Sequence, residues 1–446
     1  MQYPAYDKYQ SSRFEKNLNI PTDWLEKRLK FIASHNDETL SEKTDPDYEI
    51  EYVDISSVDL VNGITNTETM SFEKAPSRAR RIVKDGDSIV STVRTYLKAI
   101  ATIRKPPENM VVSTGFAVIR PKEEICKNYL SYFLQSQGFV ESVVAHSVGV
   151  SYPAINASDL VCLPVSFPDR VDEQKKIAAF LDHKTQQIDQ LIKKKKSLMG
   201  NLNEQRIAVI THAITKGLDK NTKMKPTGVD WLGDVPEHWE TRRLKFLTNE
   251  SLQYGANEAA VLDDRDLPRF IRITDVKDDG TLHDDTFRSL TEDVAEPFLL
   301  NEGDILLARS GATVGKSFKY SKSWGKSAYA GYLIKFSVDR EIMDEDFACL
   351  YFQSSVYWAN IYSTLIQATI QNFSAEKYAN IELPLPGVGE QKEVVAYLSK
   401  SLDRLDKMKG LAMDVIEKLE EYRCSLITDA VTGKIDVRDI VVGEVV

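Results

Sequence analysis

Residues 311–317, Gly-Ala-Thr-Val-Gly-Lys-Ser, carry residue types that can bind phosphate, because glycine-rich loops followed by lysine and a hydroxyl residue cradle nucleotides. Their spacing differs from that of a P-loop, which needs about four residues between its glycines where this chain has three. Ser310 stands where the first glycine belongs, and the residues after Ser317 favour a strand over a helix. We therefore predict a glycine-bearing loop between two strands and no nucleotide site.

The patterns that mark common catalytic and metal sites do not occur in this sequence. Its six histidines form no i, i+4 pair, and no G-x-S-x-G elbow or glycine-rich dinucleotide loop precedes a predicted helix. The cysteines lie scattered, without a C-x-x-C pair, at Cys126, Cys162, Cys349 and Cys424. Such spacing indicates reduced thiols rather than a structural zinc site. We therefore expect no catalytic residues, no metal site and no cofactor.

Basic and polar residues gather in loops at matching places in the two halves of the chain. Arginine, asparagine, glutamine, serine and tyrosine are residue types that bond phosphates and base edges. The candidate DNA-binding residues are Arg78, Arg80, Arg81, Arg94, Lys98, Ser151, Tyr152 and Asn156 in the first half, and Arg309, Ser310, Thr313, Lys316, Gln371 and Asn372 in the second. The alternative is that these loops are solvated and only close strands. For Lys193 to Lys196, on a predicted helix, a solvated face is the more typical interpretation.

Two long helices are predicted to position these loops. Residues 172–213 contain no proline and place apolar residues at alternating steps of three and four, and the helix should end near Gly217, where glycine favours a left-handed cap. A second stretch from Glu390 holds the same heptad. The stripe residues are Ala178, Leu181, Ile188, Ile192, Met199, Leu202 and Val209 in the first helix, and Val395, Leu398, Leu402, Leu405, Ala412, Ile416, Leu419 and Leu426 in the second. Because a heptad stripe needs a partner helix, we expect these two helices to pair.

The chain is duplicated end to end. Residues 20–24, Ile-Pro-Thr-Asp-Trp, correspond to residues 235–239, Val-Pro-Glu-His-Trp, and both lead into Arg-Leu-Lys-Phe. Further landmarks follow in one order: Gly86-Asp87 with Gly303-Asp304, Gly115-Phe116 with Gly331-Tyr332, Asn128-Tyr129 with Asp346-Phe347, and Glu173-Gln174 with Glu390-Gln391. Their offsets drift only between 215 and 218 residues. The chain is therefore predicted to be two copies of a globular part followed by a long helix.

Each globular part is predicted to be built from short strands with few helices. In the first copy we expect strands at residues 48–55, 88–93, 111–119 and 160–165, and a short helix at residues 129–139. A polar linker is expected at residues 219–227. The predicted segments are an N-terminal lead (1–18), a first domain (19–167), a central helix region (168–222), a second domain (223–385) and a C-terminal helix region (386–446). The fold class is thus α+β, with two duplicated domains joined by two long helices.

Length and composition set further bounds. A chain of 446 residues with 42% hydrophobic content can bury more than one core. The N-terminus lacks an apolar signal region and no run of about eighteen apolar residues occurs, so we expect a soluble, cytoplasmic protein. The net charge of −10 argues against nucleic acid, but the charge is uneven. Residues 172–216 carry nine Lys/Arg against five Asp/Glu and residues 389–434 carry eight against nine, which favours pairing of the helices.

A duplicated order of P-x-x-W-x-x-x-R/K-L, then G-D, then E-Q-K at the start of a long helix resembles the specificity subunit of type I restriction-modification systems. The resemblance covers nearly the whole chain. It implies that each globular part is a target recognition domain for one half of a split site in double-stranded DNA. It also implies an antiparallel coiled coil with pseudo-two-fold symmetry that spaces the domains and docks two methyltransferase subunits, with nuclease subunits in the full restriction complex. The family subunit itself has no catalytic activity.

The two copies differ where the candidate loops lie. The first has Arg94-Thr95-Tyr96-Leu97 where the second has its glycine-bearing loop, so we expect a bipartite, asymmetric site. The heptad stretch would form a rod of roughly 48 Å, against about 34 Å between half-sites on one face of a duplex. Two alternatives stay open: a scaffold that assembles protein partners, which the acidic charge favours, and an enzyme whose dispersed acidic residues form a site.

Overall fold

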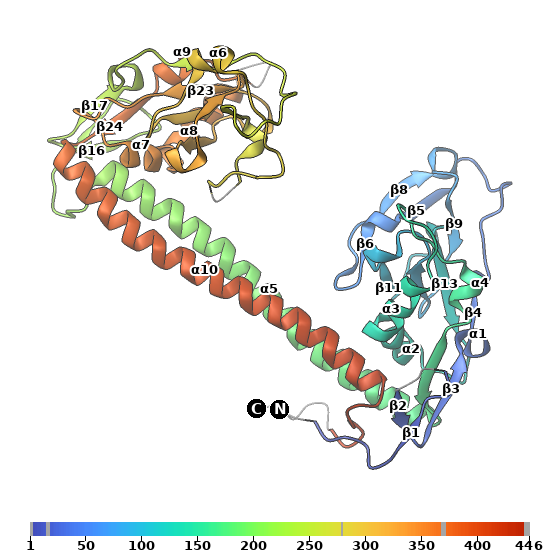
Figure 1. Ribbon diagram of the computed structural model, residues 1–446. Coiled ribbons are helices and arrows are strands. Elements are labelled where there is room, and N and C mark those ends of the chain that lie inside the picture. Colours follow the sequence, from blue (N-terminus) through green and yellow to red (C-terminus); the bar gives the residue numbers. More distant parts are fainter. Residues whose placement is uncertain (1–2, 15–17, 278–279, 367–371, 441–446) are drawn as a thin grey trace. The chain divides into compact units, whose positions relative to one another are not determined.

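The computed structural model describes residues 3–14, 18–277, 280–366 and 372–440 (Figure 1). The chain divides into two compact units. Unit 1 comprises Met1–Lys196 with Met413–Val446, and unit 2 comprises Ser197–Ala412. No helix in the described ranges is long and apolar enough to span a bilayer.

Unit 1 contains two four-stranded sheets. The first has the order β11-β10-β13-β4 and is antiparallel, and the second has the order β8-β5-β12-β9, in which β5 and β12 run parallel. These strands are β4 (Ala33–His35), β5 (Glu49–Val53), β8 (Glu68–Ser71), β9 (Ala79–Ile82), β10 (Ser88–Ser91), β11 (Ile100–Thr102), β12 (Met110–Ser113) and β13 (Phe116–Pro121). Three strand pairs complete the unit: β1 (Tyr9–Ser11) with β2 (Asn19–Pro21), β3 (Trp24–Arg28) with β14 (Pro164–Pro168), and β6 (Val58–Asp59) with β7 (Gly63–Ile64).

Short helices cover these strands, and here three expectations need correction. The helices are α1 (Leu29–Ile32), α2 (Lys127–Gln135), α3 (Gln137–Ala145) and α4 (Ala157–Leu160), with 3₁₀ turns η1 (Ile55–Ser57), η2 (Phe72–Lys74) and η3 (Thr95–Leu97). The strand expected at residues 111–119 is two strands, because the chain turns at Gly115, whose carbonyl accepts from the Thr92 amide at 2.8 Å. The helix expected at residues 129–139 breaks at Ser136, whose hydroxyl donates to the Phe133 carbonyl at 2.6 Å. The closing strand starts only at Pro164, since residues 157–160 form α4.

Unit 2 repeats the main sheet of this plan strand by strand, whereas the second sheet is reduced to two strands among the described residues. Its main sheet has the order β18-β23-β20-β21, corresponding to β4-β13-β10-β11, and its parallel pair β19–β22 corresponds to β5–β12. The strands are β15 (Met224–Pro226), β16 (Asp234–Pro236), β17 (Glu240–Arg243), β18 (Gln253–Tyr254), β19 (Arg269–Ile271), β20 (Ile305–Ala308), β21 (Ser317–Lys319), β22 (Ser327–Tyr329), β23 (Leu333–Phe336) and β24 (Glu382–Leu385). The helices are α6 (Glu292–Ala295), α7 (Glu345–Tyr351), α8 (Ser355–Ile366) and α9 (Ala375–Ala379), with 3₁₀ turns η4 (Leu244–Phe246), η5 (Ile273–Asp275), η6 (Glu296–Phe298), η7 (Gly311–Thr313) and η8 (Lys322–Trp324). The expected linker at 219–227 is partly structured, because β15 pairs with β16.

The long helices are α5 (Val171–Lys216) and α10 (Val388–Val431), and they pack side by side (Figure 1). In unit 1 the first half of α5 meets the last half of α10, and Arg423 bonds Asp189 at 3.0 Å. In unit 2 the last half of α5 meets the first half of α10, and Arg206 lies 3.6 Å from Asp406. The helices therefore run antiparallel. Most predicted stripe residues are buried, with Met199, Val209, Val395, Ile416 and Leu419 partly so.

Each long helix ends against the tryptophan that opens a domain. α5 ends as expected at Gly217, which has φ +71 and whose added Cβ would lie 3.3 Å from the Trp239 ring. Gly433, with φ +73, follows α10, and its added Cβ would lie 3.4 Å from the Trp24 ring. Both tryptophans are at most 2% exposed. The duplicated Trp landmark is thus explained by packing at the junction of helix and domain.

Candidate nucleic-acid interface

In the first repeat, an arginine stacked on a tyrosine projects from the end of β10. The Arg94 guanidinium lies 5.0 Å from the centroid of the Tyr152 ring, and that ring is 67% exposed. Arg94 takes up φ 50, a left-handed conformation that turns the chain directly into η3. The loop that carries Tyr152 is fixed beside β10, because the Ile155 amide donates to the Thr92 carbonyl at 2.9 Å. We call Arg94 and Tyr152 the first Arg–Tyr pair.

The second repeat carries a similar pair at the end of β20, the strand that corresponds to β10. The Arg309 guanidinium lies 4.7 Å from the centroid of the Tyr254 ring and donates to the Gly331 carbonyl at 3.3 Å. The Tyr254 hydroxyl accepts from the Ala375 amide at 2.9 Å, which fixes the ring. We call Arg309 and Tyr254 the second Arg–Tyr pair. Sequence reasoning missed Tyr254, because the tyrosines come from different segments in the two repeats, a loop for Tyr152 and strand β18 for Tyr254.

An arginine held against an aromatic face is suited to recognising anions and base edges. A guanidinium is a planar fork of N–H donors that can lie over an aromatic ring, although Arg309 already uses one donor on the Gly331 carbonyl and has its Nε buried. Such a fork pairs in two-point fashion with phosphate oxygens or with the acceptors of guanine. Stacking also restricts the side chain before any ligand arrives, which lowers the entropy lost on binding.

The other first-repeat candidates separate into two groups. Lys98, Ser151 and Asn156 are exposed and lie on the same segments as the first Arg–Tyr pair. Lys98 has φ 52 at the end of η3, and the Asn156 side chain donates to Asp159 at 3.1 Å. This group therefore surrounds one turn at the end of β10.

The second group consists of the three arginines at β9, in the other sheet. Arg78 bonds Asp54 at 2.7 Å and the Tyr52 hydroxyl at 3.1 Å, and these bonds to Tyr52 and Asp54 raise the pKa of Arg78. Arg80 lies over the Phe72 ring. The Nε of Arg81 is buried without a hydrogen-bond partner in the described structure, and burial lowers its pKa. Arg78 is thus already ion-paired within the domain.

The second-repeat candidates gather more closely. Ser310 forms a β-bridge with Asn372, and the Phe373 amide donates to the Arg309 carbonyl at 2.8 Å. Thr313 lies in η7 and Lys316 is exposed just after it, whereas Gln371 lies outside the described residues. As predicted, the segment from Gly311 is a loop between β20 and β21, not the start of a long helix.

Two polar atoms in this group lack partners within the described part of the chain. They are the Nε of Arg309 and the Oδ1 of Asn372, both buried. Unsatisfied buried polar groups are uncommon in folded proteins, since each one costs about 1–3 kcal/mol. Two such buried atoms beside the second Arg–Tyr pair fit a site that binds a polar ligand.

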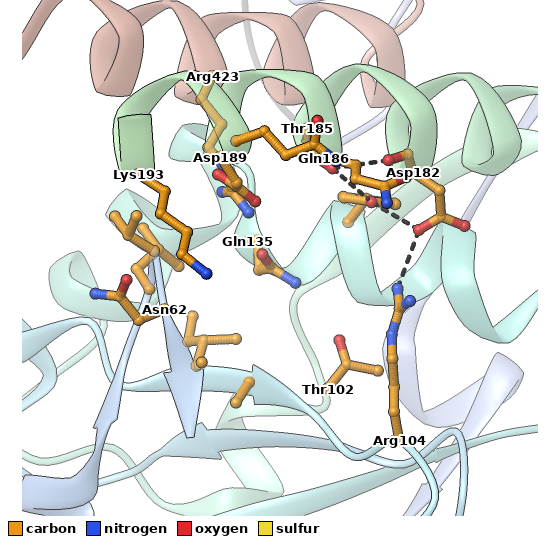
Figure 2. A pocket seen from close by; sticks show the side chains of 17 residues that line it. Asn62, Thr102, Arg104, Gln135, Asp182, Thr185, Gln186, Asp189, Lys193 and Arg423 are labelled. Atoms are coloured by element: carbon orange, nitrogen blue, oxygen red, sulfur yellow. Dashed lines mark hydrogen bonds and ion pairs between the residues drawn. The ribbon is translucent and has the colours of Figure 1, made fainter. Parts of the chain in front are cut away.

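Unit 1 also has a cavity of about 670 Å³ between α5, the turn that joins β6 to β7, and β11 (Figure 2). Asp182 of α5 accepts from Arg104 at 3.0 Å and from the Tyr132 hydroxyl at 2.8 Å. Lys193 reaches into the cavity from α5 (Figure 2). The charged groups of the cavity have mixed sign and several are already paired. The cavity is therefore better explained as a polar interface between the domain and the helix than as an active site. Among the described residues, no group of three or more His, Cys, Asp or Glu could hold a metal ion.

Comparison with known proteins agrees with this architecture. The sequence pattern of the family described as "Type I restriction modification DNA specificity domain" matches residues 21–198 and residues 236–416. The type I restriction enzyme MjaVIII specificity subunit of Methanocaldococcus jannaschii is 25% identical, over 97% of this chain and 98% of its own length. The HindI specificity subunit of Haemophilus influenzae is 27% identical over 34% of each chain.

A solved structure concerning complex assembly and conformational transition of the type I R-M system contains a chain with the same fold. The TM-score is 0.70 at 20% identity, and the match covers 93% of this chain and 99% of the other. The scaffold alternative finds no support in these comparisons. Because the specificity-domain pattern matches twice and spans most of the sequence, this chain belongs to the family of type I restriction-modification specificity subunits, whose role is DNA sequence recognition.

Proposed function

We propose that the chain recognises a bipartite, asymmetric site in double-stranded DNA, with residues 19–167 and 223–385 as its two target recognition domains. The observation that carries this proposal is the pair of stacked arginines. Arg94 and Arg309 follow the ends of the corresponding strands β10 and β20, two residues apart in register, and each is held over an exposed tyrosine. The surrounding loops differ, which suits two domains that recognise different bases.

Within each domain, the stacked arginine is the proposed base- or phosphate-contacting residue. Lys98, Ser151, Tyr152 and Asn156 would supply further contacts in the first half-site. Ser310, Thr313, Lys316, Gln371 and Asn372 would do so in the second. Arg78, Arg80 and Arg81 are the weaker candidates, because Arg78 and Arg80 are engaged within the domain.

The remaining parts of the proposal concern assembly. Specificity subunits of type I systems work within a complex with DNA and other subunits. We propose that this chain docks two methyltransferase subunits and, in the full restriction complex, nuclease subunits, in the cytoplasm. Those partners would supply the catalysis, and the coiled coil of α5 and α10 would set the gap between half-sites.

The test is to replace each stacked arginine and to map binding preference. We expect Arg94→Ala and Arg309→Ala, each assembled with its methyltransferase subunit, to relax preference in one half-site only. The expected loss is about 1–3 kcal/mol of discrimination, because one two-point contact disappears. Arg404→Ala, which removes an exposed arginine from α10, is the matched control. Selection from DNA libraries randomised in each half measures this; equal weakening on all sequences would reduce both arginines to phosphate contacts.

A further inference from the structure

Both repeats expose the same phenylalanine at the same place in the fold. The segment Arg-Leu-Lys-Phe ends at Phe31 in the first repeat and at Phe246 in the second. Phe31 is 57% exposed and Phe246 is 60% exposed. A lysine lies against each ring: Lys30 at 5.4 Å from the Phe31 centroid, and Lys245 at 5.3 Å from the Phe246 centroid.

Packing explains only the leucine of this segment. Leu29 and Leu244 are 0% exposed and belong to the two main cores. Their amides are held in the same way, donating to the Leu163 carbonyl at 3.0 Å and the Ile381 carbonyl at 2.9 Å. The fold therefore fixes the segment rigidly, while the arginine, lysine and phenylalanine side chains face solvent in both repeats. No feature of either core accounts for an exposed phenyl ring kept in both copies.

The duplication separates this surface from the DNA-recognition loops. Those loops differ between repeats, with Arg94-Thr95 in one where Gly311-Ala312 stands in the other. The Arg-Leu-Lys-Phe side chains are the same in both repeats, and such a shared set cannot distinguish two different half-sites. It suits a partner that is present once per repeat and is the same each time. A phenyl ring also bonds no phosphate, whereas aromatic residues are common anchors at protein interfaces.

The charges around each ring define the partner's chemistry. Lys122 joins Lys30 beside Phe31, donating to the Phe31 carbonyl at 3.0 Å. In the second repeat, Phe246 lines a hollow of about 680 Å³ together with Arg242, Arg243 and Glu382. Arg242 is paired with Glu240 and Arg243 with Glu382, so the basic group that remains beside the ring is Lys245. A complementary surface would offer an apolar pocket for the ring and carboxylates on its rim.

We propose that Phe31 and Phe246 are the anchors of two equivalent docking surfaces, each taking one copy of the same protein subunit through an apolar pocket rimmed by carboxylates. This inference rests on the proposed function, in which two methyltransferase subunits bind the chain, and it assigns that contact to particular side chains. The surfaces lie one in each repeat, which matches two copies of one partner.

The experiment uses the full chain and the purified methyltransferase subunit of the same restriction-modification system. Native mass spectrometry counts the bound copies and calorimetric titration measures each affinity. We expect the wild type to bind two methyltransferase subunits tightly. Phe31→Ala or Phe246→Ala alone should leave one tight site and make the other about 30-fold weaker, and the double variant should have two weak sites. Phe31→Tyr keeps the ring and should bind within about threefold of the wild type. Phe14→Ala removes a phenylalanine that is 44% exposed in only one repeat, and it should change nothing.

The outcomes distinguish the inference from the function it rests on. A double variant that binds two methyltransferase subunits as tightly as the wild type overturns the inference alone. A double variant that loses affinity for target DNA, while still binding the subunit normally, assigns the rings to DNA and also overturns it. If the wild-type chain shows no sequence preference in DNA binding and binds no methyltransferase subunit, both the inference and the proposed function are overturned.

Discussion

Replacing the buried glutamine at the start of each long helix should loosen the junction between helix and domain. Gln174 is 0% exposed; its Oε1 accepts from the Cys126 amide at 2.7 Å and its Nε2 donates to the Pro168 carbonyl at 2.8 Å. Gln391 accepts from the Asp344 amide at 2.7 Å and donates to two backbone carbonyls at 2.9 and 2.8 Å. In both repeats the accepted amide begins a domain helix, α2 or α7. The glutamine of the duplicated Glu-Gln landmark therefore connects the long helix to the domain through buried hydrogen bonds.

The number of groups left without partners sets the expected cost. Each buried polar group that loses its partner costs about 1–3 kcal/mol. Gln174→Ala leaves two such groups, and we expect a loss of about 3 kcal/mol at this junction. Gln391→Ala leaves three, and we expect about 4 kcal/mol by the same rule. The better helix propensity of alanine offsets less than about 1 kcal/mol of either cost.

Amide hydrogen exchange measures the effect locally. With about 1.4 kcal/mol per tenfold change, the Cys126 amide should exchange about 100-fold faster in Gln174→Ala, and the Asp344 amide faster still in Gln391→Ala. Gln190→Ala is the matched control, since Gln190 is exposed on α5 and should matter little. Unchanged protection of the Cys126 amide in Gln174→Ala would refute the assignment of Gln174 as this connection.

Three further perturbations test other parts of the structure. Gly433→Ala should destabilise unit 1 by more than about 2 kcal/mol in urea unfolding, because it combines a positive φ with a steric clash against the proline of β2. Gly228→Ala is the control: Gly228 has φ +76 with open space around it, so this variant should lose only the backbone strain of about 1–2 kcal/mol. Asp182→Asn should cost about 1 kcal/mol, since it removes the charge from bonds to an arginine and a tyrosine, and the loss should shrink at high salt. Seven residues inserted after Lys196 and seven after Ala412 should lengthen the paired helices by about 10 Å in heptad register and widen the preferred DNA gap by about three base pairs. If Gly433→Ala loses no more stability than Gly228→Ala, the packing argument for Gly433 is wrong. A loss of stability in Asp182→Asn that does not change with salt would contradict its electrostatic origin. An unchanged DNA gap after the two insertions would contradict the role of the paired helices as a spacer.

Local periodicity made the long helices predictable. The heptad stripe is a property of each helix alone, so the boundaries near residue 172 and Gly217 agree with α5 to within a few residues. The duplication likewise needed only comparison of the chain with itself. Short strands were less predictable, because in a run such as 111–119 the break at Ser113-Thr114-Gly115 is short and strands tolerate such residues, so only the tertiary contacts at Gly115 show that the chain turns there.

The candidate site was predictable in part. Arg94 and Arg309 follow from basic residues near the ends of corresponding strands in the two repeats, but their stacking partners depend on how distant segments are brought together in each sheet. Tyr254 lies far from Arg309 in sequence and is joined to it only by the sheet. In the same way, the pairing of Arg78 with Asp54 joins separate segments of the first domain, so sequence alone could not show that this arginine is engaged.

The most direct measurement of the central claim is a map of the modified bases in DNA treated with this chain and its methyltransferase subunit. If each repeat recognises its own half-site, sequencing should find methylation at one motif made of two different short blocks separated by a fixed gap of unspecified bases. Replacing Arg94 should then degrade one block and leave the other intact. A single contiguous motif, two identical blocks, or methylation without any common motif would contradict the account.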